Sequence, residues 1–367
     1  MPAHVPPDHE DDNRPAPSGF WEWVSRNAEL PAFDRLLFLL YGVRIVAVLN
    51  VVAELDIAGL IHERPRTARE LAEATGTQER VLRRVLRAAT AIEVFAELPD
   101  GRYVLTPEAE SLAPSGFGLR DMTLFNTGEI FTTGFAALLH SVRTGEPAFD
   151  HAFGTSLYAY FDEHPAAGEL FDRCMLQRSR LVINAGDLLA TTDLGRFSRI
   201  ADIGGGRGHF LGEVLSRHRH MTGLLFERQS VLDHAPALLD QYGVEDRVDL
   251  VAGDYFEAVP AGCDAYMLNA VLNAYDDDRA AHLLERVREA IGTRADPRLL
   301  ICEKVVSHQP NKWDYSKLVD LDLLVLTGGG ERTAAEWREL TSRAGFELVS
   351  APARKGSPWT VLECRPV

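Results

Sequence analysis

The stretch Arg199-Ile-Ala-Asp-Ile-Gly-Gly-Gly-Arg-Gly-His-Phe210 decides the fold that we predict for this chain. A short β-branched run ends in Asp202, and a glycine-rich turn then opens a helical pattern. Glycines at Gly204, Gly206 and Gly208 permit a sharp turn from strand to helix, and they let a ligand approach the backbone without meeting a Cβ atom. A nucleotide-like ligand suits such a loop best, although glycine turns also end strands in ordinary α/β domains.

Two later apolar runs also end in residues that suit a nucleotide. The run Leu224-Leu-Phe226 is followed by Glu227, roughly where a doubly wound fold places a carboxylate that binds ribose hydroxyls. The run Val248-Asp-Leu-Val251 is followed by Gly253-Asp-Tyr-Phe256, an acid and two aromatic rings that could receive an adenine. From these residues alone a nicotinamide cofactor stays open.

The order of these motifs closely resembles the S-adenosylmethionine (SAM) site of class I methyltransferases. More specifically, residues 30–367 resemble small-molecule O-methyltransferases with an N-terminal winged helix, a family that includes bacterial secondary-metabolite enzymes and plant caffeate and hydroxyindole O-methyltransferases. The resemblance implies that SAM binds and leaves as S-adenosylhomocysteine (SAH). It also implies cofactor contacts from a set of residues after the strands: Asp202, Gly204, Gly206, Glu227, Arg228, Asp254, Tyr255, Phe256 and Asn269.

Length and composition agree with a soluble globular protein of two domains. The 367 residues exceed what one hydrophobic core usually serves, and 46% hydrophobic with 25% charged residues is ordinary for a globular protein. The net charge of -16 disfavours nucleic acid as a partner, because DNA-binding surfaces use Lys and Arg to neutralise phosphates. Four scattered cysteines indicate neither a disulfide framework nor a zinc site, so we expect no metal and a cytoplasmic location.

The N-terminal region divides into a tail and an apolar segment. Residues 1–18 are rich in Pro, Asp and His and lack a signal-peptide pattern, so we predict a disordered tail. From Phe33 to Leu60 the chain is apolar, and we expect its charged residues to interrupt it before it reaches a membrane-spanning length. A buried helix of this kind needs partners on several sides. The resemblance implies that a second subunit supplies them, so we expect a homodimer and no membrane; a central helix of a monomer is the alternative.

Residues 19–110 carry the pattern of a winged helix. Thr67-Ala-Arg-Glu70 is a capping box that opens a short helix, and Thr77 is expected to cap a second one. Strands at 95–98 and 102–105, joined by Pro-Asp-Gly, add a wing. By motif alone the arginines of the second helix could enter a DNA groove, as in a regulator. The acidity of the chain opposes this, and the resemblance implies a dimerisation module instead.

Residues 111–188 read as a helical connector, which the resemblance identifies as the wall of the substrate chamber. Relatives sandwich a planar acceptor between a Met and aromatic side chains from this region, so Phe125, Phe153 and Met175 are candidates, with plain core packing as the alternative. His151 either caps a turn or faces the chamber as a titrating group.

Residues 189–367 alternate apolar runs with helical patterns. This alternation predicts a mostly parallel, doubly wound sheet with a ligand crevice at the carboxyl ends of its strands. We expect strands near residues 199–203, 224–227, 248–251, 265–268, 299–303, 346–350 and 360–364.

One departure from the family pattern follows the fourth of these strands. The chain reads Leu268-Asn-Ala-Val-Leu-Asn-Ala-Tyr-Asp-Asp277, where relatives commonly read Leu-Lys-His-Val-Leu-His-Asp-Trp-x-Asp. The second His of that pattern is the family's general base, and Asn273 stands in its place. An amide hydrogen-bonds but takes up no proton near neutral pH, so Asn273 can orient an acceptor without activating it. Glu303 and Glu331 match the acids that flank this His in the family, although alone they could be an exposed strand end and a helix N-terminal acid.

These features predict a SAM-dependent methyltransferase of a small aromatic or polyketide-like secondary metabolite, as in antibiotic biosynthesis. We favour transfer to oxygen over nitrogen or carbon. Losing a general base costs a factor of about 10² to 10⁴, whereas positioning can supply effective molarities of about 10⁵ M or more, so transfer can proceed by positioning. The alternative is an enzyme of the same fold that keeps SAM as a bound cofactor and runs hydroxylation, decarboxylation or pericyclic cyclisation.

Overall fold

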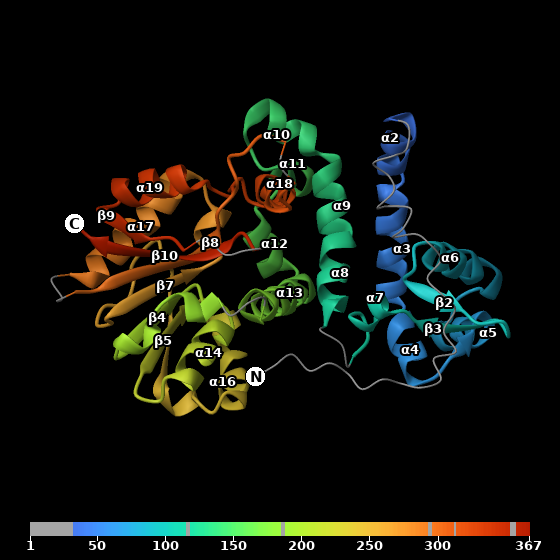
Figure 1. Cartoon of the computed structure of the whole chain (residues 1–367), viewed down its shortest axis with the longest axis horizontal. Coiled ribbons are helices and arrows are strands. Elements are labelled where there is room, and N and C mark those ends of the chain that lie inside the picture. The colour runs from blue at the N-terminus through green and yellow to red at the C-terminus, as the bar shows by residue number, and fades with distance from the viewer. Residues whose placement is uncertain (1–31, 115–117, 185–187, 293–295, 312, 353–356) are drawn as a thin grey trace. The chain divides into compact units, whose positions relative to one another are not determined.

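The computed structural model describes residues 32–114, 118–184, 188–292, 296–311, 313–352 and 357–367 (Figure 1). The chain forms two compact units, residues 1–128 and 129–367. The predicted connector, residues 111–188, is therefore divided between them. The predicted disordered tail, residues 1–18, lies outside the described residues.

The N-terminal unit is helical with a small three-stranded sheet of order β1-β3-β2, and this confirms the winged helix. Its elements are α2 (Ala32–Leu40), α3 (Gly42–Glu54), α4 (Ile57–Glu63), β1 (Arg66–Thr67), α5 (Ala68–Thr75), α6 (Glu79–Ala91), β2 (Phe95–Glu97), β3 (Arg102–Leu105), α7 (Pro107–Glu110) and α8 (Leu119–Thr127). The capping box is present, since the Thr67 and Glu70 side chains each accept from the other residue's backbone amide. The predicted cap at Thr77 is wrong: α6 begins after Gln78, and the Thr77 hydroxyl lies 2.9 Å from that of Thr75.

The apolar segment at the start of this unit differs from the single buried helix that we predicted. It consists of α2, α3 and α4, because the chain turns at Tyr41 and again at Asp56, whose φ is +47°. Within one chain it is not buried, since Leu39 is 71% and Val43 74% exposed. The prediction on length was also wrong: by length and composition alone, Leu36–Glu54 could cross a membrane.

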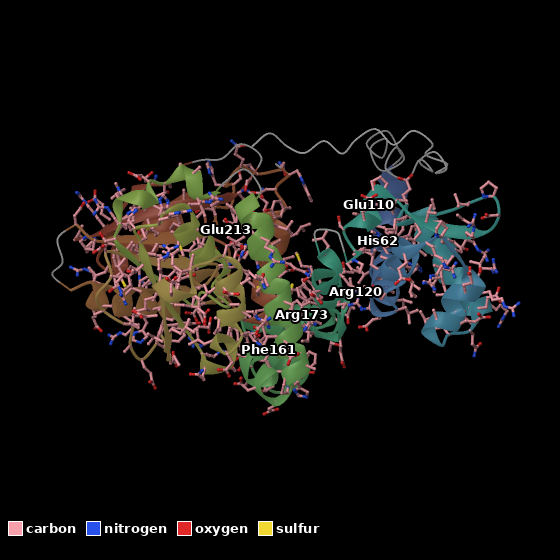
Figure 2. The ribbon with its side chains drawn as sticks, turned by 90° about the horizontal axis from the view of Figure 1, so that it is seen from below. His62, Glu110, Arg120, Phe161, Arg173 and Glu213 are labelled. Carbon is pink, nitrogen blue, oxygen red and sulfur yellow. The ribbon has the colours of Figure 1, made fainter. Side chains whose placement is uncertain are left out.

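Arg120 ties α8 to α3 within this unit (Figure 2). Its Nε donates to the carbonyl oxygen of Ala53 at 2.9 Å, and it pairs with Asp56 at 3.4 Å. Asn50 of α3 also donates to the hydroxyl of Thr127 at 3.2 Å. The first helix of the predicted connector, α8, therefore packs with the winged helix.

The C-terminal unit is built on a seven-stranded sheet of order β6-β5-β4-β7-β8-β10-β9. Neighbours from β6 to β8 run parallel, whereas β10 pairs antiparallel with both β8 and β9, so the mostly parallel doubly wound sheet is confirmed. The strands are β4 (Arg199–Ile203), β5 (Thr222–Glu227), β6 (Val248–Ala252), β7 (Ala265–Asn269), β8 (Arg298–Lys304), β9 (Phe346–Ser350) and β10 (Trp359–Pro366). All seven expected strands are present.

Helices cover both faces of this sheet (Figure 1). One core lies beneath α17 (Asp277–Ile291) and α19 (Ala334–Arg343), and the other beneath α14 (His209–Arg217) and α16 (Ala235–Gln241). The alternation of side chains along the buried strands explains the two cores, because Ile203 faces the first and Ile200 the second. Short helices fill the connections: η1 (Leu188–Thr191), η2 (Leu194–Arg196), α15 (Gln229–Leu232), η3 (Glu245–Arg247) and η4 (Leu272–Ala274).

A helical layer completes the unit. It comprises α9 (Glu129–Ala136), α10 (Leu138–Thr144), α11 (Ala148–Phe153), α12 (Leu157–Glu163), α13 (Pro165–Asn184) and α18 (Ser316–Leu326). The helix α18, from late in the sequence, packs against α9 and α11. Phe161 of α12 stacks on Phe171 of α13, with ring centroids 4.9 Å apart (Figure 2). These contacts bring α13 to the edge of the sheet that carries the site.

Candidate active site

A cavity of about 430 Å³ opens at the carboxyl ends of the parallel strands, where β4 and β7 lie side by side and the strand order reverses. Ligands of open α/β sheets bind at this position, and the volume is in the range of small-molecule sites. The helix α13 supplies the opposite wall, including the predicted acceptor residue Met175. Eight predicted cofactor residues line the cavity: Gly204, Gly206, Glu227, Arg228, Asp254, Tyr255, Phe256 and Asn269.

The glycine loop leaves room for a ligand at one position in particular. Gly204, Gly206 and Gly208 all have positive φ, at 67°, 58° and 84°. A Cβ atom on Gly204 would lie 2.9 Å from Val271, whereas one on Gly206 would meet nothing within 4 Å. A side chain at Gly206 would therefore project into the open cavity.

The carboxylate of Glu227 faces this loop and is held by backbone amides. Its Oε2 accepts from the Gly206 amide at 3.2 Å, and its Oε1 accepts from the Arg228 amide at 2.8 Å. Each oxygen keeps a further lone pair for a hydroxyl group. Burial raises the pKa of Glu227, and the Arg228 amide opposes this rise. Glu227 stands at the end of β5, and its carboxylate oxygens can accept further hydrogen bonds, so it suits the ribose hydroxyls of SAM.

The loop after β6 forms the next part of the wall. Asp254 Oδ1 accepts from the Phe256 amide at 2.8 Å, which fixes the turn. The Tyr255 hydroxyl lies 2.6 Å from that of Tyr275, and the Phe256 ring meets the Tyr275 ring edge-on at 4.9 Å. Aromatic faces beside a carboxylate fit a nucleobase.

Asp202 is the predicted cofactor residue that does not line the cavity. It is 0% exposed, and burial raises the pKa of its carboxyl to about 7. A Cβ atom on Gly205 would lie 2.5 Å from its Oδ2, so the side chain sits beneath the glycine loop. Neither of its carboxylate oxygens has a hydrogen-bond partner among the described residues.

The structure brings the three predicted catalytic residues together. Asn273, on η4, is 2% exposed, and its backbone amide donates to Oε1 of Glu303 at 3.3 Å. Its carbonyl oxygen accepts from the Gly330 amide at 2.9 Å, next to Glu331. Three side-chain atoms here are buried without a hydrogen-bond partner among the described residues: Asn273 Nδ2, Glu303 Oε2 and Glu331 Oε2. Buried polar atoms are nearly always paired, so these three indicate a place for a polar group. None of the three residues lines the 430 Å³ cavity.

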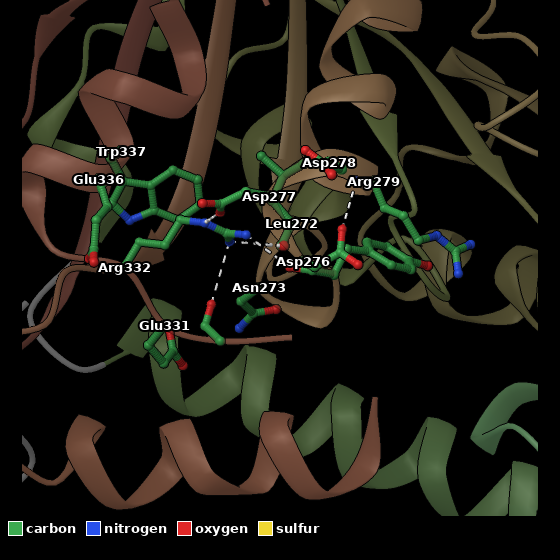
Figure 3. A network of polar contacts seen from close by, with 12 residues as sticks. Leu272, Asn273, Asp276, Asp277, Asp278, Arg279, Glu331, Arg332, Glu336 and Trp337 are labelled. Carbon is green, nitrogen blue, oxygen red and sulfur yellow. Dashed lines mark hydrogen bonds and ion pairs between the residues drawn. The ribbon is translucent and has the colours of Figure 1, made fainter. Parts of the chain in front are cut away.

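Arg332 fastens the turn that carries Asn273, and sequence reasoning missed it (Figure 3). Its guanidinium donates to the carbonyl oxygens of Leu272 at 3.1 Å and Tyr275 at 2.8 Å. Its Nε donates to Asp277 Oδ1 at 2.8 Å, at the start of α17. In the sequence, only the position of Arg332 directly after Glu331 pointed to the site. These hydrogen bonds could not be predicted, because they join segments more than 50 residues apart.

The adjoining glycine makes the same turn compact. A Cβ atom on Gly329 would lie 2.1 Å from the carbonyl oxygen of Asn273, so only glycine fits. Together with Arg332, this close approach fixes the backbone of Asn273.

A group of buried charges adjoins the three residues, and it includes Lys304, which sequence reasoning also missed. Lys304 forms an ion pair with Glu331 and lies 4.7 Å from the ring of Trp359. Burial, and next the charge of Glu331, raises the pKa of Glu303 to about 8. Burial also raises the pKa of Asp322 to about 6. Burial therefore favours the protonated form of the Glu303 carboxyl.

The predicted acceptor residues His151, Phe153 and Phe125 are not part of the lining of this cavity. His151 is exposed and stacks on His140 with centroids 4.0 Å apart, and Phe153 packs on Phe149 at 4.4 Å. Neither lines the cavity, because α11 directs them to other helices. Phe125 is buried in the N-terminal unit.

Known proteins share both units of the chain. The model of the O-methyltransferase domain matches residues 135–347, and that of the O-methyltransferase dimerisation domain matches residues 37–115. An 8-amino-8-demethylriboflavin N,N-dimethyltransferase of Streptomyces davaonensis is 38% identical, over 93% of this chain and 97% of its own. A phenazine O-methyltransferase of Lysobacter antibioticus is 35% identical, over 94% of this chain and 99% of its own.

A solved structure extends the comparison to the ligands. An O-methyltransferase from neocarzinostatin biosynthesis, crystallised with SAM and 2-hydroxy-5-methyl naphthoic acid, superposes with a TM-score of 0.76 at 30% identity. The match covers 88% of this chain and 96% of the neighbour.

Proposed function

Because the chain belongs to the family of SAM-dependent O-methyltransferases, we propose that it methylates an oxygen of a small aromatic secondary metabolite without a histidine base. SAM supplies an electrophilic methyl group and leaves as SAH. Glu227 would hold the ribose hydroxyls, and Asp254 with Phe256 would hold the adenine. Gly206 would leave room for the cofactor beside the loop.

The observation that carries this proposal is the buried Asn273 at the position of the family's base. Its side-chain nitrogen is a donor without a partner among the described residues, so it can hold the oxygen of an acceptor but cannot take its proton. Burial raises the pKa of Glu303 and so weakens it as a base, and Glu331 is already paired with Lys304. The residues around Asn273 therefore position an acceptor that is already ionised or that loses its proton to solvent.

Transfer to nitrogen is the second candidate, and one observation favours it. The relative that is 38% identical is named an N,N-dimethyltransferase. A neutral aromatic amine attacks through its own lone pair and needs no base before the transfer, which also suits an asparagine. A third possibility is an enzyme that binds SAM without consuming it. The experiment with labelled SAM in the Discussion distinguishes it from methyl transfer.

The proposal includes a homodimer formed through the matched dimerisation domain, in the cytoplasm and without nucleic acid or membrane. The exposed apolar residues of α2 and α3 support it, since large apolar patches on soluble proteins usually mark an interface.

The test compares the wild type with Asn273→Ala and Asn273→His from pH 6 to 9, on hydroxynaphthalenes of graded acidity. If Asn273 only positions the acceptor, the wild-type rate follows the acceptor's own pKa, and Asn273→Ala lowers the rate by a similar factor at each pH. Asn273→His raises the rate on weakly acidic phenols, by up to about 10²-fold. A pH profile that is the same for every acceptor and disappears in Asn273→Ala would overturn the proposal.

A further inference from the structure

We propose that Arg178 is a recognition residue for a carboxylate on the acceptor, so that the preferred acceptors are aromatic acids. This inference rests on the proposed function, because it names the substrate class of the same site. It concerns a different residue and a different step, binding, from the transfer attributed to Asn273.

Arg178 forms no ion pair among the described residues, although the carboxyl groups of Glu303 and Asp322 lie near enough for its charge to oppose the rise that burial causes in their pKa values. This arginine lines the cavity from α13, one turn beyond Met175. Its guanidinium lies over the ring of Trp359, 5.4 Å from the centroid, and Trp359 lines the same cavity. Its Nη2 is buried, yet among the described residues it has no hydrogen-bond partner. A buried donor on a charged group is costly to leave unpaired, which indicates a ligand.

The other cations that line the cavity are already engaged. Arg207 pairs with Asp172 at 3.5 Å, and Arg228 pairs with Asp162 at 3.3 Å. Arg279 lies over the ring of Phe256, 4.6 Å from its centroid, and none of its nitrogens is buried without a partner in the described structure. Arg207 Nε is also buried without a partner among the described residues, but the same guanidinium already pairs with Asp172. Arg178 is thus the lining arginine that has a buried nitrogen without a partner and no ion pair among the described residues.

The position of Arg178 assigns it to the acceptor and not to the cofactor. The residues that would hold SAM lie at the ends of β4, β5, β6 and β7, and the ion pair of Arg207 with Asp172 stands at the glycine loop among them. Arg178 instead shares the Trp359 ring with Lys304, the partner of Glu331. Burial, and next the charge of Arg178, lowers the pKa of Lys304, so the two cations lie near each other. Arg178 therefore belongs to the group of charges around Asn273.

The chemistry of the group favours a planar oxyanion. A guanidinium stacked on an aromatic ring keeps its edge free, and its paired N–H groups match a carboxylate in two parallel hydrogen bonds. Asp322 lies close enough for the charge of Arg178 to oppose the rise of its pKa, but the two form no ion pair in the described structure. An incoming carboxylate would accept a hydrogen bond from the buried Nη2 of Arg178.

The experiment measures binding of two matched probes to the SAH-saturated protein by fluorescence. The probes are 3-hydroxy-2-naphthoic acid and 2-naphthol, which lacks the carboxylate. Hydrogen bonds to charged groups are worth roughly 10- to 100-fold in affinity, so we expect the acid to bind at least about tenfold more tightly. We expect Arg178→Gln to abolish this preference and Arg178→Lys to keep part of it. Arg180→Gln, an exposed arginine of the same helix, is the matched control and keeps the preference.

Three results would overturn the inference. The first is that the wild type binds the two probes with equal affinity, or binds neither of them. The second is a preference that survives Arg178→Gln. The third is a loss of SAH affinity in Arg178→Gln, since the guanidinium would then serve the carboxylate of the cofactor. Methyl transfer from SAM to both probes at equal efficiency would leave the proposed function standing while this inference fails.

Discussion

Lys304 and Glu331 form an ion pair whose side chains are 2% and 0% exposed, respectively. Both charges are withdrawn from water, and the indole ring of Trp359 closes one side of the ammonium. Removing one member of such a pair leaves an uncompensated buried charge, which typically costs about 3–5 kcal/mol, whereas replacing both members is often neutral.

We therefore expect Lys304→Met to lower the free energy of unfolding by about 3–5 kcal/mol. The double variant Lys304→Met/Glu331→Gln should recover most of this loss, because no charge is left buried without its partner. Urea unfolding of the wild type, the single variant and the double variant measures both effects. Equal losses in the single and double variants would contradict the role of charge compensation.

The raised pKa of Glu303 gives the stability a defined dependence on pH. The pKa is about 8 in the folded protein, against 4.5 for an ordinary glutamate, so between these limits the folded state holds a proton that the unfolded state has lost. Stability should fall as the pH rises through this window. Urea midpoints at pH 5, 6.5 and 8 should fall less steeply in Glu303→Gln, whose amide does not titrate. Asp202, with a pKa of about 7, adds a slope of the same sign, so Glu303→Gln should flatten the profile only in part. Parallel profiles would show that Glu303 is ionised at neutral pH.

The glycine loop allows a matched test of cofactor binding. Gly206 and Gly243 have φ of 58° and 63°, and a Cβ atom at either would meet nothing within 4 Å. Replacement by Ala should destabilise the fold similarly, by about 1–2 kcal/mol, because both backbones are left-handed. Only Gly206→Ala should lose affinity for SAH in calorimetry, since Gly206 lines the cavity. Unchanged affinity in Gly206→Ala would place the cofactor elsewhere.

The exposed apolar face of α2 and α3 predicts the state of association. Light scattering should give twice the chain mass for the wild type, and Leu39→Glu/Val43→Glu should give the mass of one chain. Val349→Glu, at a 52% exposed valine on β9, is the control and should stay dimeric. A wild type that is monomeric at micromolar concentration, or that sediments with lipid vesicles, would contradict the dimer.

Much of the C-terminal unit could be predicted from sequence, because its signals are local. Buried parallel strands appear as short apolar runs, such as Leu224–Phe226, and glycines mark the turn that follows β4. Eight of the nine cofactor positions line the cavity for the same reason, since they directly follow strands. Asp202 differs because its side chain is buried beneath the glycine loop and does not face the cavity.

The remaining features depend on contacts between distant segments. Lys304 ends a strand whose other residues are mostly apolar, and only the arrival of Glu331 makes a buried ammonium tolerable. Arg332 is ordinary in sequence, and its partners become visible only when η4 packs beside it. The break at Tyr41 has no strong signal, because the residues around it suit a continuous helix.

The central claim, that the enzyme consumes SAM to methylate a small acceptor, is tested most directly with donor labelled with ¹³C at the methyl carbon. The wild type is incubated with labelled SAM and a panel of hydroxynaphthoic acids, hydroxyphenazines and aromatic amines, and the product and SAH are quantified by mass spectrometry. We expect one labelled methyl group on a product oxygen for each SAH formed. Product that requires SAM but contains no label, without any SAH released, would contradict methyl transfer and show that SAM is only a bound cofactor.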